Sequence, residues 1–184
     1  MIRSICIAIV IGVFALGASC NNNVYPSSIQ GFETLEADIV HKFGNESYFT
    51  DFVITQNQEQ ELEVSFLQTY APNSFEMVGW AVVNGTWEKV SEVSLELGGG
   101  DIKDYMYSMT NEVNIIKMGY LANLSIERAK DKGLKNISLD QVSVISPDDG
   151  DKSKMGYVIK LSSPTQNIQF LYNLKGDLIK KEIL

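Results

Sequence analysis

The sequence predicts an α+β fold made of two tandem units, each a helix followed by a four-stranded antiparallel meander, with the helix packed on one face of the sheet. Two stretches have apolar residues at helical spacing, and each precedes four segments rich in β-branched and aromatic residues. Three pairs of landmarks recur at a nearly constant offset, which indicates duplication of the unit. The pairs are Gly44 and Gly133, 89 residues apart, Asp51 and Asp140, also 89, and Gly85 and Gly176, 91.

The first 20 residues have the composition of a secretory leader. One cation, Arg3, precedes an uncharged apolar run over residues 5–16, and Gly17-Ala18-Ser19-Cys20 follows. This run of about 12 residues is too short to cross ~30 Å of hydrocarbon at 1.5 Å per residue. The sequence therefore predicts a cleaved signal peptide over residues 1–19 and not a transmembrane helix.

The small residues that lead into Cys20 resemble the lipobox of bacterial lipoproteins. The resemblance implies that Cys20 receives a diacylglycerol and that residues 20–30 form the lipidated cysteine and a polar tether. The sequence departs from the family pattern at Gly17, where a large aliphatic residue is usual. Cleavage after Gly17 or Ser19 by an ordinary signal peptidase, giving a soluble secreted protein, is the alternative. Because Asn21 is not the aspartate that tends to retain lipoproteins at the inner membrane, the resemblance favours the outer membrane.

The cysteine content fits this interpretation. The chain has two cysteines, Cys6 inside the leader and Cys20 at its end, so the mature protein has no pair to form a disulfide. A lone thiol is a liability in an exported protein, and acylation of Cys20 removes it. The alternative is that Cys20 is an incidental unpaired thiol.

Charge is distributed unevenly along the mature chain. Residues 21–97 contain 12 acidic and two basic side chains, whereas residues 98–184 contain 11 acidic and 12 basic ones. An acidic surface repels nucleic acid and attracts cationic partners, so the sequence predicts no nucleic-acid binding. The acidic first unit, with Glu88, Glu92 and Glu96 along one strand, is either a contact face for a protein partner or a solvated sheet face.

The first unit, residues 31–97, begins with a predicted helix over Thr34–Phe43 that ends at Gly44, where a left-handed cap is favourable. Predicted strands follow over Tyr48–Thr55 and Leu62–Thr69, where β-branched and aromatic residues predominate.

A hairpin completes the first unit. Asn84-Gly85 joins predicted strands over Phe75–Val83 and Thr86–Leu97, because both turn residues tolerate the positive φ of a type I′ turn. The pairs expected in this register are Val83 with Thr86, Val82 with Trp87, and Trp80 with Lys89.

The hairpin register assigns side chains to two faces. Glu88, Glu92 and Glu96 are expected together on the outer face. The two tryptophans lie among aliphatic residues on the other face, which favours a core over a ligand platform. The expected inner residues are Val78, Trp80, Val82, Trp87, Val93, Leu95 and Leu97.

Gly98-Gly99-Gly100 marks the boundary to the second unit, residues 101–184. A short strand over Tyr105–Met109 is expected to lead into a helix over Glu112–Lys132 that is capped by Gly133. In the strands that follow, alternation points Phe170, Tyr172 and Ile179 inward, whereas the repeat offset would point Leu171 and Leu178 inward. The expected strands span Ile137–Ser146, Met155–Ser162, Ile168–Leu174 and Leu178–Leu184.

This layout of two helix-then-meander units behind a lipid anchor resembles the PepSY-like, or β-lactamase-inhibitor-protein-like, envelope proteins of bacteria. The resemblance concerns the layout of most of the mature chain and is not based on a diagnostic motif. It implies that each helix lies across one face of a curved sheet and that exposed sheet faces or hairpin loops bind a protein partner.

Residues that carry catalysis are sparse. His41 is the single histidine, so neither a histidine-rich zinc site nor a Cys-His pair can form, and no nucleophile elbow, Walker motif or dinucleotide motif is present. The three acids Asp148, Asp149 and Asp151 are a weak calcium candidate, because Lys152 and Lys154 oppose a cation and a polar turn explains them equally well.

The sequence therefore predicts a membrane-anchored, non-enzymatic lipoprotein that needs no cofactor and binds a protein or another envelope component. The alternatives are a lipoprotein that binds a small ligand or ion in a pocket between helix and sheet, and, more remotely, a hydrolase.

Overall fold

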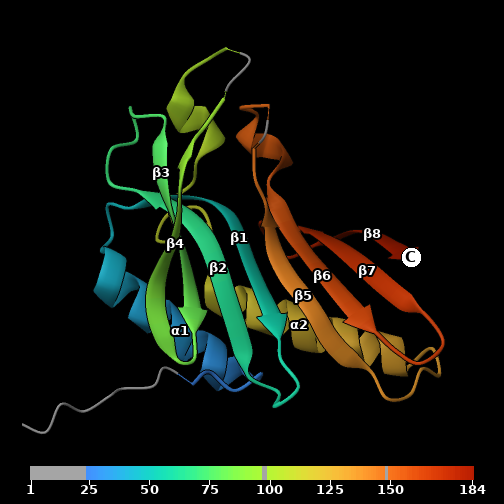
Figure 1. Cartoon of the computed structure of the whole chain (residues 1–184). Coiled ribbons are helices and arrows are strands. Elements are labelled where there is room, and N and C mark those ends of the chain that lie inside the picture. Colours follow the sequence, from blue (N-terminus) through green and yellow to red (C-terminus); the bar gives the residue numbers. More distant parts are fainter. Residues whose placement is uncertain (1–23, 97–98, 148) are drawn as a thin grey trace, which may run out of the picture.

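Eight antiparallel strands form one continuous sheet in the computed structural model, which describes residues 24–96, 99–147 and 149–184 (Figure 1). The strands lie in the order β4-β3-β2-β1-β5-β6-β7-β8, so β1 and β5 meet at the centre and β4 and β8 are the two edges. The predicted α+β class is confirmed. The strands are β1 (Tyr48–Gln56), β2 (Leu62–Thr69), β3 (Glu76–Val83), β4 (Thr86–Ser94), β5 (Ser138–Ile145), β6 (Gly156–Ser162), β7 (Asn167–Asn173) and β8 (Leu178–Ile183).

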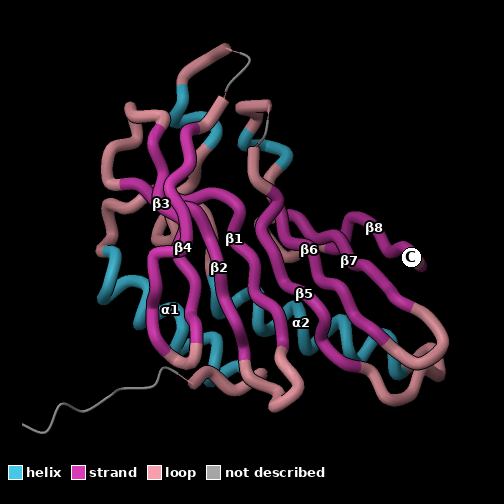
Figure 2. Tube along the Cα trace, in the orientation of Figure 1, coloured by secondary structure: helices cyan, strands magenta, loops and turns pink. Residues whose placement is uncertain are grey.

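Two helices, α1 (Ile29–Phe43) and α2 (Ile115–Lys130), cover the same face of this sheet and pack against each other (Figure 2). Their close approach depends on Gly119, because a Cβ there would lie 2.8 Å from the ring of Phe32. The element order is a helix followed by four strands, twice. The halves share one sheet and one core instead of forming separate domains, since a single buried cluster draws residues from both.

The centre of this core under α1 is a group of aromatic rings. Phe66 of β2 contacts the rings of Phe43, Phe49 and Phe52, with centroids 5.2 to 5.6 Å apart. Trp87 of the β3–β4 hairpin also packs on Phe66, with a centroid separation of 5.4 Å. The hairpin tryptophans therefore contribute to the core, as the sequence predicts.

Helix α1 begins five residues earlier than expected, because Ser28 caps it by accepting a hydrogen bond from the Gly31 backbone N–H. The chain before it is already folded: Tyr25 is fully buried, and its carbonyl accepts a hydrogen bond of 2.7 Å from the Leu62 N–H. The Tyr25 hydroxyl donates to Asp38 at 2.9 Å. Burial, followed by this carboxylate, raises the pKa of Tyr25. The tether expected over residues 20–30 therefore stops before Tyr25.

The β3–β4 hairpin confirms the three expected cross-strand pairs but contains a bulge that the sequence does not predict. Gly79 lies opposite Ser91 and Trp80 opposite Lys89, so β4 has an extra residue at Val90. Because side chains alternate between faces along a strand, one extra residue exchanges the faces of everything beyond it.

The bulge corrects two predictions. Glu88 lies opposite Ala81 and keeps the expected face away from the tryptophans, whereas Glu92 lies opposite Val78 on the other face, so the expected shared acidic face is wrong for Glu92. Val93 lies opposite Met77, and Leu95 packs with Met77 in a second small core on the face away from the helices. Leu97 lies outside the described residues.

Two details of the second half also differ from expectation. The segment predicted as a short strand over Tyr105–Met109 is not a strand: it begins at the last residue of a 3-10 helix, Ile102–Tyr105, and forms one bridge, from Tyr107 to Phe49. Phe170 and Tyr172 are buried as alternation predicts, but Ile179 is exposed because it is the extra residue of another bulge, between the Leu171–Lys180 and Tyr172–Leu178 pairs.

Candidate functional site

The three acids expected to bind a partner are all exposed, but they do not form one cluster. Glu92 is paired with Lys89, whose hydrogen bond and charge lower the pKa of Glu92. Glu96 follows the end of β4. Because Glu88 faces away from Glu92, a partner that contacts β4 from one side can use only one of these two.

The acidic turn before β6 is explained by internal hydrogen bonds. Asp151 accepts bonds from the N–H and hydroxyl of Ser153 at 3.0 and 2.6 Å, and Asp149 pairs with Lys154. These donors lower the pKa of Asp149 and Asp151. Within the described residues no group of three potential metal ligands is found. Asp148, the third member of the calcium candidate, lies outside the described residues.

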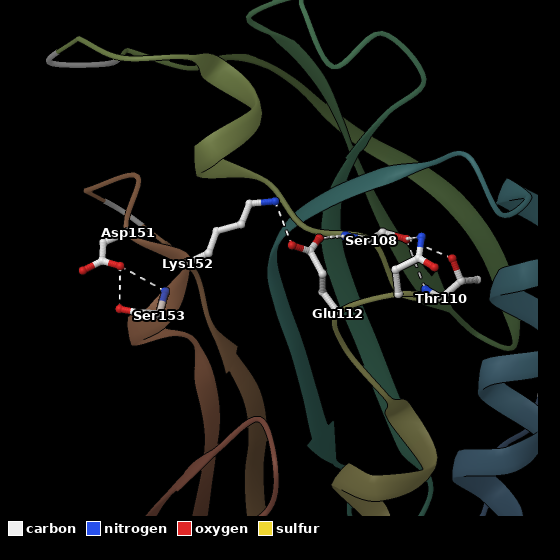
Figure 3. Close-up of polar contacts among 7 residues, drawn as sticks. Ser108, Thr110, Glu112, Asp151, Lys152 and Ser153 are labelled. Atoms are coloured by element: carbon white, nitrogen blue, oxygen red, sulfur yellow. Dashed lines mark hydrogen bonds and ion pairs between the residues drawn. The ribbon is translucent and has the colours of Figure 1, made fainter.

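Lys152 from the same turn contacts the segment that precedes α2 (Figure 3). Its ammonium lies 2.8 Å from one oxygen of Glu112, and the other oxygen accepts the Ser108 N–H at 2.8 Å. The Ser108 hydroxyl in turn bonds with Thr110 at 2.9 Å. Each carboxylate oxygen of Glu112 therefore has a donor, and the network ties the β5–β6 connection to the segment before α2.

The remaining candidate residues from the sequence are His41 and Cys20. His41 is an exposed residue of α1. Cys20 and the predicted signal peptide lie outside the described residues. No helix in the described part of the chain is long and apolar enough to cross a membrane.

A groove that the sequence did not indicate lies where the two halves meet. It has a volume of about 510 Å³ and is bounded by α2, the β1–β2 turn, the start of β5 and the residues around the start of α1. Phe32, Ile126 and Leu139 contribute apolar wall, and Asp140 is the single charged residue among those that line it. The groove is therefore suited to a small polar ligand that is uncharged or weakly cationic.

The β1–β2 turn holds one wall of this groove in place. The Asn57 side-chain oxygen accepts the backbone N–H groups of Glu59 and Glu61, both at 2.9 Å, which fixes the turn. The Gln56 amide donates to Ser27 at 2.6 Å and links the turn to the chain before α1.

Other polar groups of the groove are open to a ligand. Within the described residues, the side chains of Gln58, Asn123 and Asp140 make no hydrogen bond to another protein group, and all three are exposed. Their amide and carboxylate groups could both donate to and accept from a bound molecule. Gln58 comes from the β1–β2 turn, Asn123 from α2 and Asp140 from β5. No local sequence motif therefore identifies the three residues as a group.

Comparison with known proteins identifies the fold but no family. No family model matches the sequence, and no curated protein matches it significantly. A crystal structure of a protein from Clostridium difficile 630, described there as a candidate lipoprotein, superposes with a TM-score of 0.51 and 10% sequence identity. The match covers 83% of this chain and 92% of that one. At this identity the likeness establishes a shared fold.

Proposed function

We propose that this protein is a lipoprotein of the bacterial cell envelope, anchored through Cys20 in the outer membrane, and that it acts as a non-enzymatic binding module for a protein or another envelope component. The observation that carries the proposal is the leader, a short apolar run that ends in small residues and Cys20. The shared fold with a protein described as a candidate lipoprotein supports it.

The folded chain before α1 is consistent with an anchor held close to the domain. Tyr25 is fully buried, so four residues, 21–24, or five Cα–Cα steps, separate the acylated Cys20 from the core. Fully extended, a chain of that length reaches roughly 18 Å at ~3.6 Å per residue. An anchored domain would therefore sit close to the bilayer.

Partner binding is tested by isolating the anchored protein after cross-linking in intact cells and identifying proteins that co-purify. Reversing Glu92 and Glu96 to lysine is expected to lower partner recovery at least about fivefold at low salt, because rim charges steer association. A separate Glu88→Lys variant tests the opposite face of β4. The matched control reverses Glu127 and Asp131, two exposed acids near the end of α2. Recovery that is unchanged in both β4 variants would contradict a contact on the acidic half.

The groove between the halves supports a second candidate function, binding of a small polar ligand. Purified protein is screened against uncharged sugars and short peptides by thermal unfolding. A ligand present at 100 times its Kd should stabilise the fold by about 2.7 kcal/mol. Asn123→Trp, which fills the groove, should abolish this shift, whereas Glu127→Trp on an exposed part of the same helix should retain it. A shift that persists in Asn123→Trp would exclude this groove as its source.

A further inference from the structure

Strand β8 is an exposed sheet edge with apolar side chains. Among the strands of the described residues it is the last of the sheet, and within that part of the chain it pairs with β7 alone. Ile179, Ile183 and Leu184 are each more than 60% exposed. An edge of this kind presents unpaired backbone groups together with apolar surface, and it is a template for pairing with another strand.

The backbone of β8 shows which residues are free to pair. The N–H of Leu184 donates inward to Asn167 at 2.9 Å. Because N–H and C=O groups alternate in direction along an antiparallel strand, those of Lys181 and Ile183 point outward. A strand added at this edge would therefore form its hydrogen-bonded pairs at Lys181 and Ile183.

Two copies of β8 that are aligned antiparallel about Lys181 have side chains of complementary charge. In this register Lys180 of each copy lies opposite Glu182 of the other, and the bulge at Ile179 ends the regular pairing beyond Lys180. Lys180 and Glu182 share the face away from the helices and already pair within one chain. Opposite charges placed directly across strands stabilise a sheet.

We propose that two copies of this protein associate through antiparallel pairing of β8, giving one continuous 16-stranded sheet around a two-fold axis at Lys181. The interface is isologous and closes at the dimer, because each β8 has a single free edge. The one like-charged pair falls on the axis. Each Lys181 ammonium lies 5.7 Å from the centre of the Phe170 ring in its own chain, which draws the two charges apart.

The opposite edge of the sheet lacks this complementarity. Strand β4 belongs to the half of the chain with 12 acids and two bases. Pairing β4 with a second β4 would bring two acidic strands together, because β4 carries Glu88 and Glu92 against the single base Lys89. The acidic half would therefore lie at both outer ends of the dimer.

Cysteine cross-linking in intact cells tests the proposal with the full chain. Paired residues in a hydrogen-bonded antiparallel pair have Cα atoms about 5.5 Å apart, which suits a disulfide. Lys181→Cys is expected to give mainly a covalent dimer under mild oxidation. Val90→Cys, an exposed position on the other edge, is the matched control and should give no covalent dimer, and the parent chain should give none either. No more dimer from Lys181→Cys than from Val90→Cys would overturn the proposal.

The register is tested by a second pair of variants. Glu182→Cys alone should cross-link at least about fivefold less than Lys181→Cys, because the two Glu182 positions are diagonal neighbours beyond disulfide reach. Cells that express Lys180→Cys and Glu182→Cys together should form the mixed dimer. More dimer from Glu182→Cys alone than from Lys181→Cys would overturn this register, and a cross-linked product of a mass other than twice the chain would show that another protein occupies the edge.

A charge exchange provides a test that needs no cysteine. Glu182→Lys should raise the dissociation constant of the detergent-extracted dimer at least about tenfold, because both cross-strand pairs become repulsive. The double variant Lys180→Glu with Glu182→Lys restores both pairs and should recover the parent value. A parent protein that sediments as a monomer at micromolar concentration would contradict the proposal.

Discussion

Replacing Cys20 by alanine is expected to abolish incorporation of labelled palmitate into the protein. The thiol is the proposed attachment point, and no other cysteine remains after the leader is removed. Cys6→Ala is the matched control, since Cys6 lies in the apolar run of the leader and should be dispensable for acylation. The measurement is lipid label in the immunoprecipitated chain; labelled Cys20→Ala protein would contradict the proposal.

Loss of the lipid should also change where the protein is found. Each buried methylene contributes about 0.8 kcal/mol to membrane binding, so several acyl chains give an anchor that high salt does not remove. A chain in which the leader of a soluble exported protein replaces residues 1–20 should appear in the soluble fraction with the same thermal stability as the parent. Continued sedimentation of this chain with membranes would reveal another anchor.

Phe66→Ala is expected to lower the free energy of unfolding by about 3 to 5 kcal/mol. The Phe66 side chain is 3% exposed and lies at the centre of the aromatic group under α1. Truncation leaves a cavity that the surrounding rings cannot close without leaving their edge-to-face contacts. Residues 21–184 contain no cysteine and so no disulfide, which leaves this core to supply most of the stability.

Urea unfolding of the unanchored chain measures the effect. Phe75→Ala is the matched control, because Phe75 is 51% exposed and precedes β3; its loss should cost less than about 1 kcal/mol. Equal destabilisation by the two substitutions would contradict the assignment of the aromatic group as the centre of the core.

Local patterns in the sequence predict most of the elements because their causes are local. The period of apolar residues identifies both helices, and the Asn84-Gly85 turn fixes the hairpin register near it. The bulges at Val90 and Ile179 have no such local signature. They depend on how each edge strand fits the twist of the sheet, and they explain why the sequence predicts the wrong faces for Glu92 and Ile179.

Features that depend on distant parts of the chain could not be predicted. Tyr25 follows a polar segment and precedes a proline, so it looks like part of a tether, and only its packing against α1 and β2 shows that it belongs to the core. The groove combines Gln58, Asn123 and Asp140, which the pairing of β1 with β5 brings to one end of the sheet. The complementary charges of β8 are visible in the sequence, but they can pair with a second copy only because β8 is an edge strand.

Intact-mass spectrometry of the native protein, isolated from membranes, tests the lipid anchor most directly. We expect a chain that begins at Cys20 and is heavier than residues 20–184 by covalently attached acyl groups. A native chain whose first residue is Ala18, or an unmodified Cys20, would contradict the anchor and leave a soluble exported protein.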